Sequence, residues 1–219
     1  MVIVLRRSRI EDFGVLMQVP QEAAEVLPAR ERILAAARRI FLDGLPEHAT
    51  MDAVAQQAGM SKKTIYREFK SQVELLHALL IENVADMGGL PPPLPGEDIE
   101  LELYGVLVRM VTHFTSPRSM ALARLIISEV RRYPELMSAS KPKGFPRELL
   151  ANWLASPAVR AQYNIEDPDE ASAMLFGMVM QDSGFRLMLD SNATMPPHLI
   201  EARARRAVQI FLRGVRKSA

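Results

Sequence analysis

Residues 50–69 read TMDAVAQQAGMSKKTIYREF, and this stretch decides the fold of the first part of the chain. Thr50 is suited to cap a helix, Asp52 in the next turn suits the positive end of the helix dipole, and Gly59 favours a left-handed helix end. Ser61 is suited to cap the helix that follows. The pattern therefore predicts two short helices joined by a tight glycine turn.

The same stretch has the composition of a helix-turn-helix. Small residues such as Ala55 and Ala58 allow two helices to cross closely, and apolar residues such as Val54 and Ile65 fix their angle. Once these are buried, the rest of the second helix faces outward, with side chains that suit phosphates and base edges. A basic surface helix that serves only packing remains the alternative. The outward residues are Lys62, Lys63, Thr64, Tyr66 and Arg67, with Lys70 just beyond.

Two further helices are expected to flank this stretch. Apolar residues recur at helical spacing over Ala29–Asp43, which predicts an amphipathic helix closed by Gly44 and Pro46. Ser71 is suited to cap a longer helix with a leucine-rich face. Residues 29–80 are therefore predicted to form a three-helix helix-turn-helix domain with a fourth helix leading out of it.

These residues resemble the TetR family of bacterial regulators from about Arg30 to Leu80. The resemblance implies a homodimer whose two recognition helices enter successive major grooves of a palindromic double-stranded DNA operator. The shared pattern is carried by Ile33-Leu34-Ala35-Ala36-Ala37, Phe41, Gly44, Thr50-Met51, Val54-Ala55, Ala58-Gly59-Met60-Ser61, Tyr66, Phe69 and Leu75-Leu76.

The resemblance also implies roles for single residues. Phosphate contacts are expected from Thr50, Thr64, Tyr66 and Lys70, and the residues nearest the bases are expected to be Lys62, Lys63 and Arg67. Members of the family often carry a small residue in place of Lys63 and a lysine in place of Gln72. The predicted DNA-binding set is Thr50, Ser61, Lys62, Lys63, Thr64, Tyr66, Arg67 and Lys70.

The remaining chain reads as helices separated by proline and glycine, so the predicted fold class is all-α. The run Pro91–Gly96 cannot be helical, because proline lacks the amide donor. Residues 122–136 resemble a helix of the AefR-like subgroup. We expect an N-terminal arm over 1–28, the helix-turn-helix domain over 29–80, and a larger ligand-sensing and dimerisation domain over 81–219. Helices are expected at about 97–115, 117–133, 146–161, 168–190 and 196–215.

The arm over residues 1–28 has no clear amphipathic period. Its arginines suit contacts with DNA phosphates, and a solvated tail is the alternative.

The last two predicted helices, 168–190 and 196–215, carry apolar residues over wide arcs and are expected to form the homodimer interface. Gly177 and Gly184 would allow close approach of a second copy. The alternative is that these apolar residues are buried within one subunit. Three polar residues in the run, Asp182, Ser183 and Arg186, suit either dimer contacts or a ligand pocket.

An unknown small-molecule effector is expected to bind an apolar, adaptable cavity in the C-terminal part. Each candidate residue is also compatible with an ordinary core, and His113 with a satisfied core histidine. The candidates are Met110, His113, Phe114, Trp153, Met174, Met178 and Phe185, with Met87 as a further methionine.

Composition excludes several classes of protein. The 219 residues include no cysteine and four scattered histidines, so neither a disulfide framework nor a metal site is expected. Apolar stretches are too short to span a membrane and no signal peptide is visible, so a cytoplasmic protein is expected. No Gly-rich phosphate loop, metal-binding helix or nucleophile elbow appears, so neither an enzyme nor a cofactor is expected.

The sequence thus predicts a ligand-responsive transcriptional regulator. The family resemblance implies a repressor that the effector releases from DNA. Activation through the same geometry stays open. The alternative class is a helical adaptor that binds a protein partner without DNA.

Overall fold

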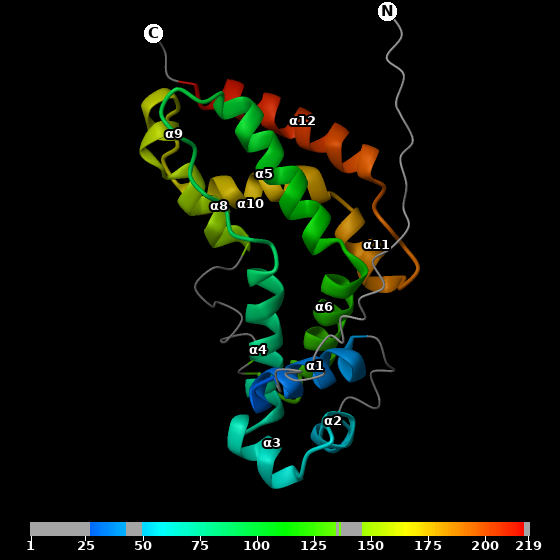
Figure 1. Ribbon diagram of the computed structural model, residues 1–219. Coiled ribbons are helices and arrows are strands. Elements are labelled where there is room, and N and C mark those ends of the chain that lie inside the picture. The colour runs from blue at the N-terminus through cyan, green and yellow to red at the C-terminus, as the bar shows by residue number, and fades with distance from the viewer. Residues whose placement is uncertain (1–26, 43–49, 135, 137–145, 217–219) are drawn as a thin grey trace, which may run out of the picture.

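The structure is a computed structural model that describes residues 27–42, 50–134, 136 and 146–216. Over these ranges the chain is helical, with one isolated antiparallel bridge between Tyr163 and Arg216, as Figure 1 shows. The prediction of an all-α fold is confirmed. The helices are α1 (Ala29–Phe41), α2 (Met51–Ala58), α3 (Lys62–Glu68), α4 (Gln72–Ala85), α5 (Ile99–Phe114), α6 (Pro117–Glu129), α8 (Pro146–Leu154), α9 (Pro157–Gln162), α10 (Pro168–Met180), α11 (Ser183–Leu189) and α12 (Pro197–Gly214).

Helices α2, α3 and α4 begin where the sequence indicated. The hydroxyl oxygens of Thr50, Ser61 and Ser71 accept backbone N–H bonds at the starts of these helices, and Gly59 ends α2 with a left-handed φ of 63°. Each cap satisfies one amide that has no partner inside its helix. Local sequence therefore sets the position of the two helices that form the turn.

A compact apolar core holds α1, α2 and α3 together. Ile33, Val54 and Ile65 are fully buried in it, and Phe69 joins them just after α3. Leucines on the first half of α4 complete this core, as do Leu122 and Leu125 of α6. The first core therefore includes a helix that lies beyond the predicted domain boundary at residue 80.

A second core lies at the other end of the molecule, where α5, α8, α10 and α12 pack against one another (Figure 1). Its largest fully buried side chain is Trp153 of α8, and Leu103, Leu107 and Met110 of α5 are also sealed from solvent. The long α4 leaves the first core and runs toward the second. The helix thus spans the distance between the two cores.

Three predicted helices are wrong in length. The helix expected over 146–161 is divided into α8 and α9, because Ser156 is extended ahead of Pro157. The helix expected over 168–190 is divided into α10 and α11, because Gln181 adopts a positive φ of 47°. The helix expected over 117–133 ends at Glu129 and continues as turns.

A side chain from α12 stabilises the break between α10 and α11. The Arg203 guanidinium donates to the carbonyl oxygens of Val179 and Met180, both at 3.3 Å, and to the Ser183 hydroxyl at 2.8 Å. Asp182 lies 3.8 Å from the same guanidinium. Ser183 and Asp182 are therefore contacts within one subunit, and the carbonyls that the helix leaves unpaired at its C-terminal end are satisfied.

The predicted arm over 1–28 lies outside the described residues except for Leu27 and Pro28, and so do Gly44 and Pro46. Among the helices that are described, none combines the length and the apolar character needed to cross a bilayer.

We predict that Arg203→Ala destabilises the protein by about 1–3 kcal/mol, because a charged donor is lost and two carbonyls at the end of α10 lose their partner. The thermal midpoint should fall by several degrees, measured by circular dichroism. Arg109→Ala removes an exposed arginine from α5 and serves as the control. Equal midpoints for the two variants would contradict the role given to Arg203.

Candidate nucleic-acid interface and internal cavity

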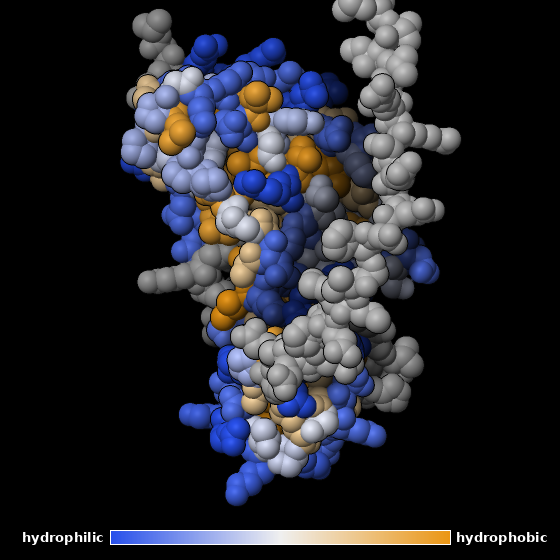
Figure 2. Space-filling model, in the orientation of Figure 1, coloured by the Kyte–Doolittle hydropathy of each residue, from blue (hydrophilic) through white to orange (hydrophobic). Residues whose placement is uncertain are grey.

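The outer face of α3 is polar and basic. Ile65 turns inward and is fully buried, whereas Lys62, Lys63 and Arg67 are exposed, and Tyr66 exposes 49% of its surface. In Figure 1, α3 lies at the end of the molecule farthest from α12, and Figure 2 shows hydrophilic side chains projecting from that end. The structure therefore presents these predicted DNA-binding residues together on one protruding surface.

The remaining predicted DNA-binding residues surround α3. Thr50 and Ser61 are exposed caps, and the Ser61 hydroxyl also lies 3.0 Å from the hydroxyl of Thr64. Lys70 is exposed, and its backbone N–H donates to the Glu74 carboxylate at 2.8 Å. Helices α2 and α3 lie at the same end of the molecule in Figure 1, and backbone N–H groups at helix N-termini favour anionic partners.

Ion pairs change the charge that this surface offers. The Lys62 ammonium lies 2.6 Å from the Asp52 carboxylate of α2, which raises the lysine pKa by hydrogen bonding and by charge. Arg67 pairs with the neighbouring Glu68 at 3.1 Å. Lys63 forms no ion pair with any residue in the described ranges. Lys63 is therefore the cation of α3 whose charge is least compensated.

Two arginines of α1 position the helix-turn-helix, a role that the sequence reasoning missed. Arg32 donates to the carbonyl of Ala58 at 3.0 Å, at the end of α2. Arg30 donates to the carbonyl of Glu68 at 3.1 Å and stacks over the Phe69 ring at 4.2 Å. A cation at a helix C-terminus interacts favourably with the helix dipole. The sequence around Arg30 and Arg32 did not indicate this role, because the carbonyl groups that they bind lie far along the chain.

A cavity of about 620 Å³ lies between the two cores. Its wall is formed by α4, α6, α10 and α11, with one residue from α5 and one from α8, and it is mostly apolar. Three polar residues take part in it: Asn83, Ser119 and Arg147. The apolar lining is Leu80, Val84, Phe114, Met120, Leu122, Ala123, Ile126, Ile127, Ala173, Phe176, Gly177, Met180, Gly184 and Met188.

The structure does not gather the predicted ligand-binding residues around this cavity. Only Phe114 of that set lines it. Met110 and Trp153 belong to the second core, as does Met87, and the ring nitrogen Nε2 of His113 lies 2.6 Å from the carbonyl oxygen of Asn83. The last three lie elsewhere: Met174 and Met178 line a second hollow beside α12, and Phe185 exposes 70% of its surface.

The sequence did contain a partial signal for the cavity. Gly177 and Gly184, which were expected from the sequence to allow close approach of a second copy, lie on its wall, as do the three methionines Met120, Met180 and Met188. Small residues leave space and methionines adapt to it. Asn83 and Ser119 were missed, because single polar residues in a helix carry no periodic signal.

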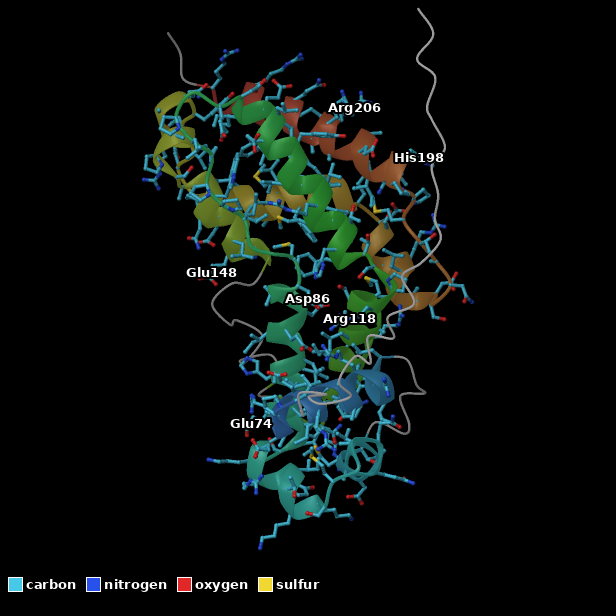
Figure 3. The ribbon with its side chains drawn as sticks, in the orientation of Figure 1. Glu74, Asp86, Arg118, Glu148, His198 and Arg206 are labelled. Atoms are coloured by element: carbon cyan, nitrogen blue, oxygen red, sulfur yellow. The ribbon has the colours of Figure 1, made fainter. Side chains whose placement is uncertain are left out.

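Charged residues connect the cavity wall to the helix-turn-helix. Glu82 of α4 accepts a hydrogen bond from Arg38 of α1 at 2.8 Å. Arg118 of α6 lies 3.7 Å from the Glu82 carboxylate and 2.9 Å from that of Asp86, and Figure 3 shows Arg118 and Asp86 close together between α4 and α6. Asn83, which lines the cavity, directly follows Glu82, which bonds α1. Two adjacent residues of α4 therefore contact the cavity and α1.

Comparison with known families assigns both halves of the chain. Residues 33–79 match the bacterial regulatory proteins of the tetR family, and residues 102–214, more than half of the chain, match the C-terminal domain of AefR-like transcriptional repressors. The chain belongs to the TetR family. It is a transcriptional regulator with a helix-turn-helix DNA-binding domain, as the sequence predicted.

Individual relatives agree with this assignment. The uncharacterised HTH-type transcriptional regulator TtgW of Pseudomonas putida is 32% identical over 107 residues, which cover 48% of this chain and 77% of TtgW. A putative TetR-family regulator from Mesorhizobium loti has a similar fold, with 23% identity, a TM-score of 0.73, and coverage of 86% of this chain and 97% of that chain. The flavonoid-responsive regulator FrrA aligns with a TM-score of 0.71 at 23% identity, over 87% of this chain and 98% of FrrA.

For this TetR-family chain we predict that Asp52→Asn strengthens DNA binding by about two- to fivefold. The change removes a negative charge from the surface expected to face DNA and frees Lys62 from an exposed ion pair. Fluorescence anisotropy with the DNA upstream of the protein's own gene measures the effect. The control is Glu102→Gln, which removes a carboxylate from α5. Unchanged affinity for Asp52→Asn would show that Lys62 does not approach the DNA.

Proposed function

We propose that this TetR-family regulator is a homodimeric repressor whose two copies of α3 enter successive major grooves of a palindromic operator, and that a small molecule in the cavity releases it. The observation that carries the DNA-binding part is the arrangement of α3. Ile65 is fully buried, while Lys63, Tyr66 and Arg67 project from the protruding end of the molecule.

The proposed roles of the residues follow from where they lie. Lys62, Lys63 and Arg67 would be nearest the bases, since they are the long cationic side chains of α3 itself. Thr50, Ser61 and Thr64 lie at helix N-termini, where hydroxyl and backbone N–H groups suit phosphate oxygens. Tyr66 and Lys70 would complete the phosphate contacts on the other side of α3.

The dimer interface is proposed on α10 and α12, with α11 beside them. Met174 of α10 and Ile210 of α12 expose 55% and 58% of their surface and line one hollow together with Met178. On α11, Phe185 and Leu189 are more exposed still. Exposed large apolar side chains favour association, and a twofold axis would place the same residues of both partners in the interface.

Release is proposed to act through α4. Leu80, Asn83 and Val84 line the cavity, and Glu82 between them bonds Arg38 of α1. A ligand that fits the cavity better when α4 is displaced would move α1 and change the separation of the paired α3 helices. Such a ligand shifts the equilibrium only by its difference in affinity for the two arrangements. Because the partner is chromosomal DNA, the cytoplasm is the proposed site of action.

The test measures how binding of the purified protein depends on salt, for the DNA upstream of its own gene and for scrambled DNA. Wild type is compared with Lys63→Ala and Tyr66→Ala. We expect specific binding that weakens with salt, and a loss of about fivefold or more in each variant. Arg109→Ala also removes one positive charge, but from α5, and should bind as wild type does.

The outcomes separate the two candidate classes. Binding that is equally weak for both DNAs and insensitive to Lys63→Ala would count against a DNA-binding role for α3 and favour the protein-binding adaptor. Reduced binding in all three variants would indicate a general effect of charge and not a contact of α3.

We predict that Ile210→Glu converts the dimer into monomers, because it places a carboxylate in the proposed apolar interface. Size-exclusion chromatography with light scattering should show wild type at twice the chain mass and the variant at the chain mass. The control is Leu101→Glu, the same kind of change at a residue of α5 that is 61% exposed. A dimeric Ile210→Glu variant would place the interface elsewhere.

A further inference from the structure

The polar part of the cavity wall is small and well defined. Asn83 of α4 and Ser119 of α6 expose only 4% and 5% of their surface, and both line the cavity. They are bonded to each other, with the Ser119 hydroxyl 3.1 Å from the Asn83 side-chain oxygen. Apart from Arg147, the rest of the described wall is apolar, so these two residues form a single polar site within it.

A chain of hydroxyl groups continues from the side-chain oxygen of Asn83. Ser116, the cap of α6, accepts the backbone N–H of Ser119 and donates its hydroxyl proton to the Ser119 oxygen at 3.1 Å. Ser119 in turn donates its own hydroxyl proton to the side-chain oxygen of Asn83. The backbone carbonyl of Asn83 is also occupied, by the ring nitrogen of His113.

One donor in this arrangement is left over. The Asn83 amide nitrogen, Nδ2, carries two N–H groups and bonds none of the residues that the structure describes. It is not one of the completely sealed, unpaired atoms in that part of the chain, so it keeps some accessible surface. Asn83 lines the cavity, so a ligand there can reach it. A ligand that fills the cavity displaces water from this nitrogen, and the donor then costs free energy unless the ligand offers it an acceptor.

We propose that the cavity takes a predominantly apolar molecule that carries a hydrogen-bond acceptor, and that Asn83 Nδ2 donates to this acceptor. This proposal rests on the proposed function, in which the cavity holds the effector. The volume of about 620 Å³ suits a drug-sized ligand with two or more rings. Asn83 is then the residue that determines specificity, because apolar contacts alone select for size and not for the position of an oxygen.

Charge also narrows the class of ligand. Among the described residues that line the cavity none is acidic, so a cationic ligand would meet no counter-charge from them. The one charged residue of the described wall is Arg147, which is exposed at the start of α8. The cavity therefore favours a neutral compound, such as a ketone or an ether, or one with an acidic group near Arg147.

The test uses two compounds that differ at one position. Fluorenone carries a carbonyl oxygen where fluorene carries a methylene group, and the two are otherwise matched in shape. Each is titrated against the full chain loaded with the neutral fluorescent probe N-phenyl-1-naphthylamine, and displacement gives the affinity. We expect wild type to bind fluorenone about three- to tenfold more tightly than fluorene, as one net hydrogen bond implies.

Two variants separate the hydrogen bond from packing. Asn83→Leu keeps a side chain of similar size without the donor and should bind the two compounds equally. Met188→Leu alters the apolar wall and should keep the preference while changing both affinities together. If Asn83→Leu fails to fold, the comparison of the two compounds on wild type still decides. A preference retained in folded Asn83→Leu would overturn the assignment of Asn83.

Failure of this inference differs from failure of the proposed function. Equal affinity of wild type for fluorenone and fluorene overturns the inference and leaves the cavity as a ligand site. If wild type takes up no probe and neither compound, both the inference and the effector role of the cavity are overturned. Operator binding, measured on the same preparation, reports on the DNA-binding function independently of either result.

Discussion

The position of α4 is the constraint on which the rest of the structure depends. Leu75, Leu76 and Leu79 fix its first half in the core of the helix-turn-helix, and Glu82 ties it to α1 and α6. Three residues of its second half line the cavity. A helix of 14 residues is about 21 Å long and resists bending over that length. In the proposed mechanism, motion at the cavity would therefore be passed to the DNA-binding end as a displacement of one rigid element.

The polar contacts around α4 lie at partly or fully buried positions. Glu82 is partly buried between two arginines, and Asn83 is nearly sealed between His113 and Ser119. Hydrogen bonds in such surroundings are costly to break without replacement. These contacts hold α4 in the arrangement that the structure shows, and under the proposed function a ligand would have to offer new contacts to displace it.

The sequence was sufficient where structure is set by nearby residues. Thr50, Ser61 and Gly59 act on the amides and carbonyls of their own turns, so the turn between α2 and α3 was predicted correctly. The break at Gln181 was not predicted, because Arg203 stabilises it from another helix. The lining of the cavity was not predicted for a similar reason. It combines residues from six helices, and no local pattern marks which side of each helix faces an empty space.

The shortness of α3 has a consequence for genetics. Seven residues are too few to remain helical alone, so the contact surface exists only while Ile65 and Phe69 are packed beneath it and Arg30 holds its end. A screen for mutants that lose operator binding would therefore recover interior and α1 positions together with the outward side chains. Phenotype alone would not tell the two groups apart, whereas the amount of folded protein in each mutant would.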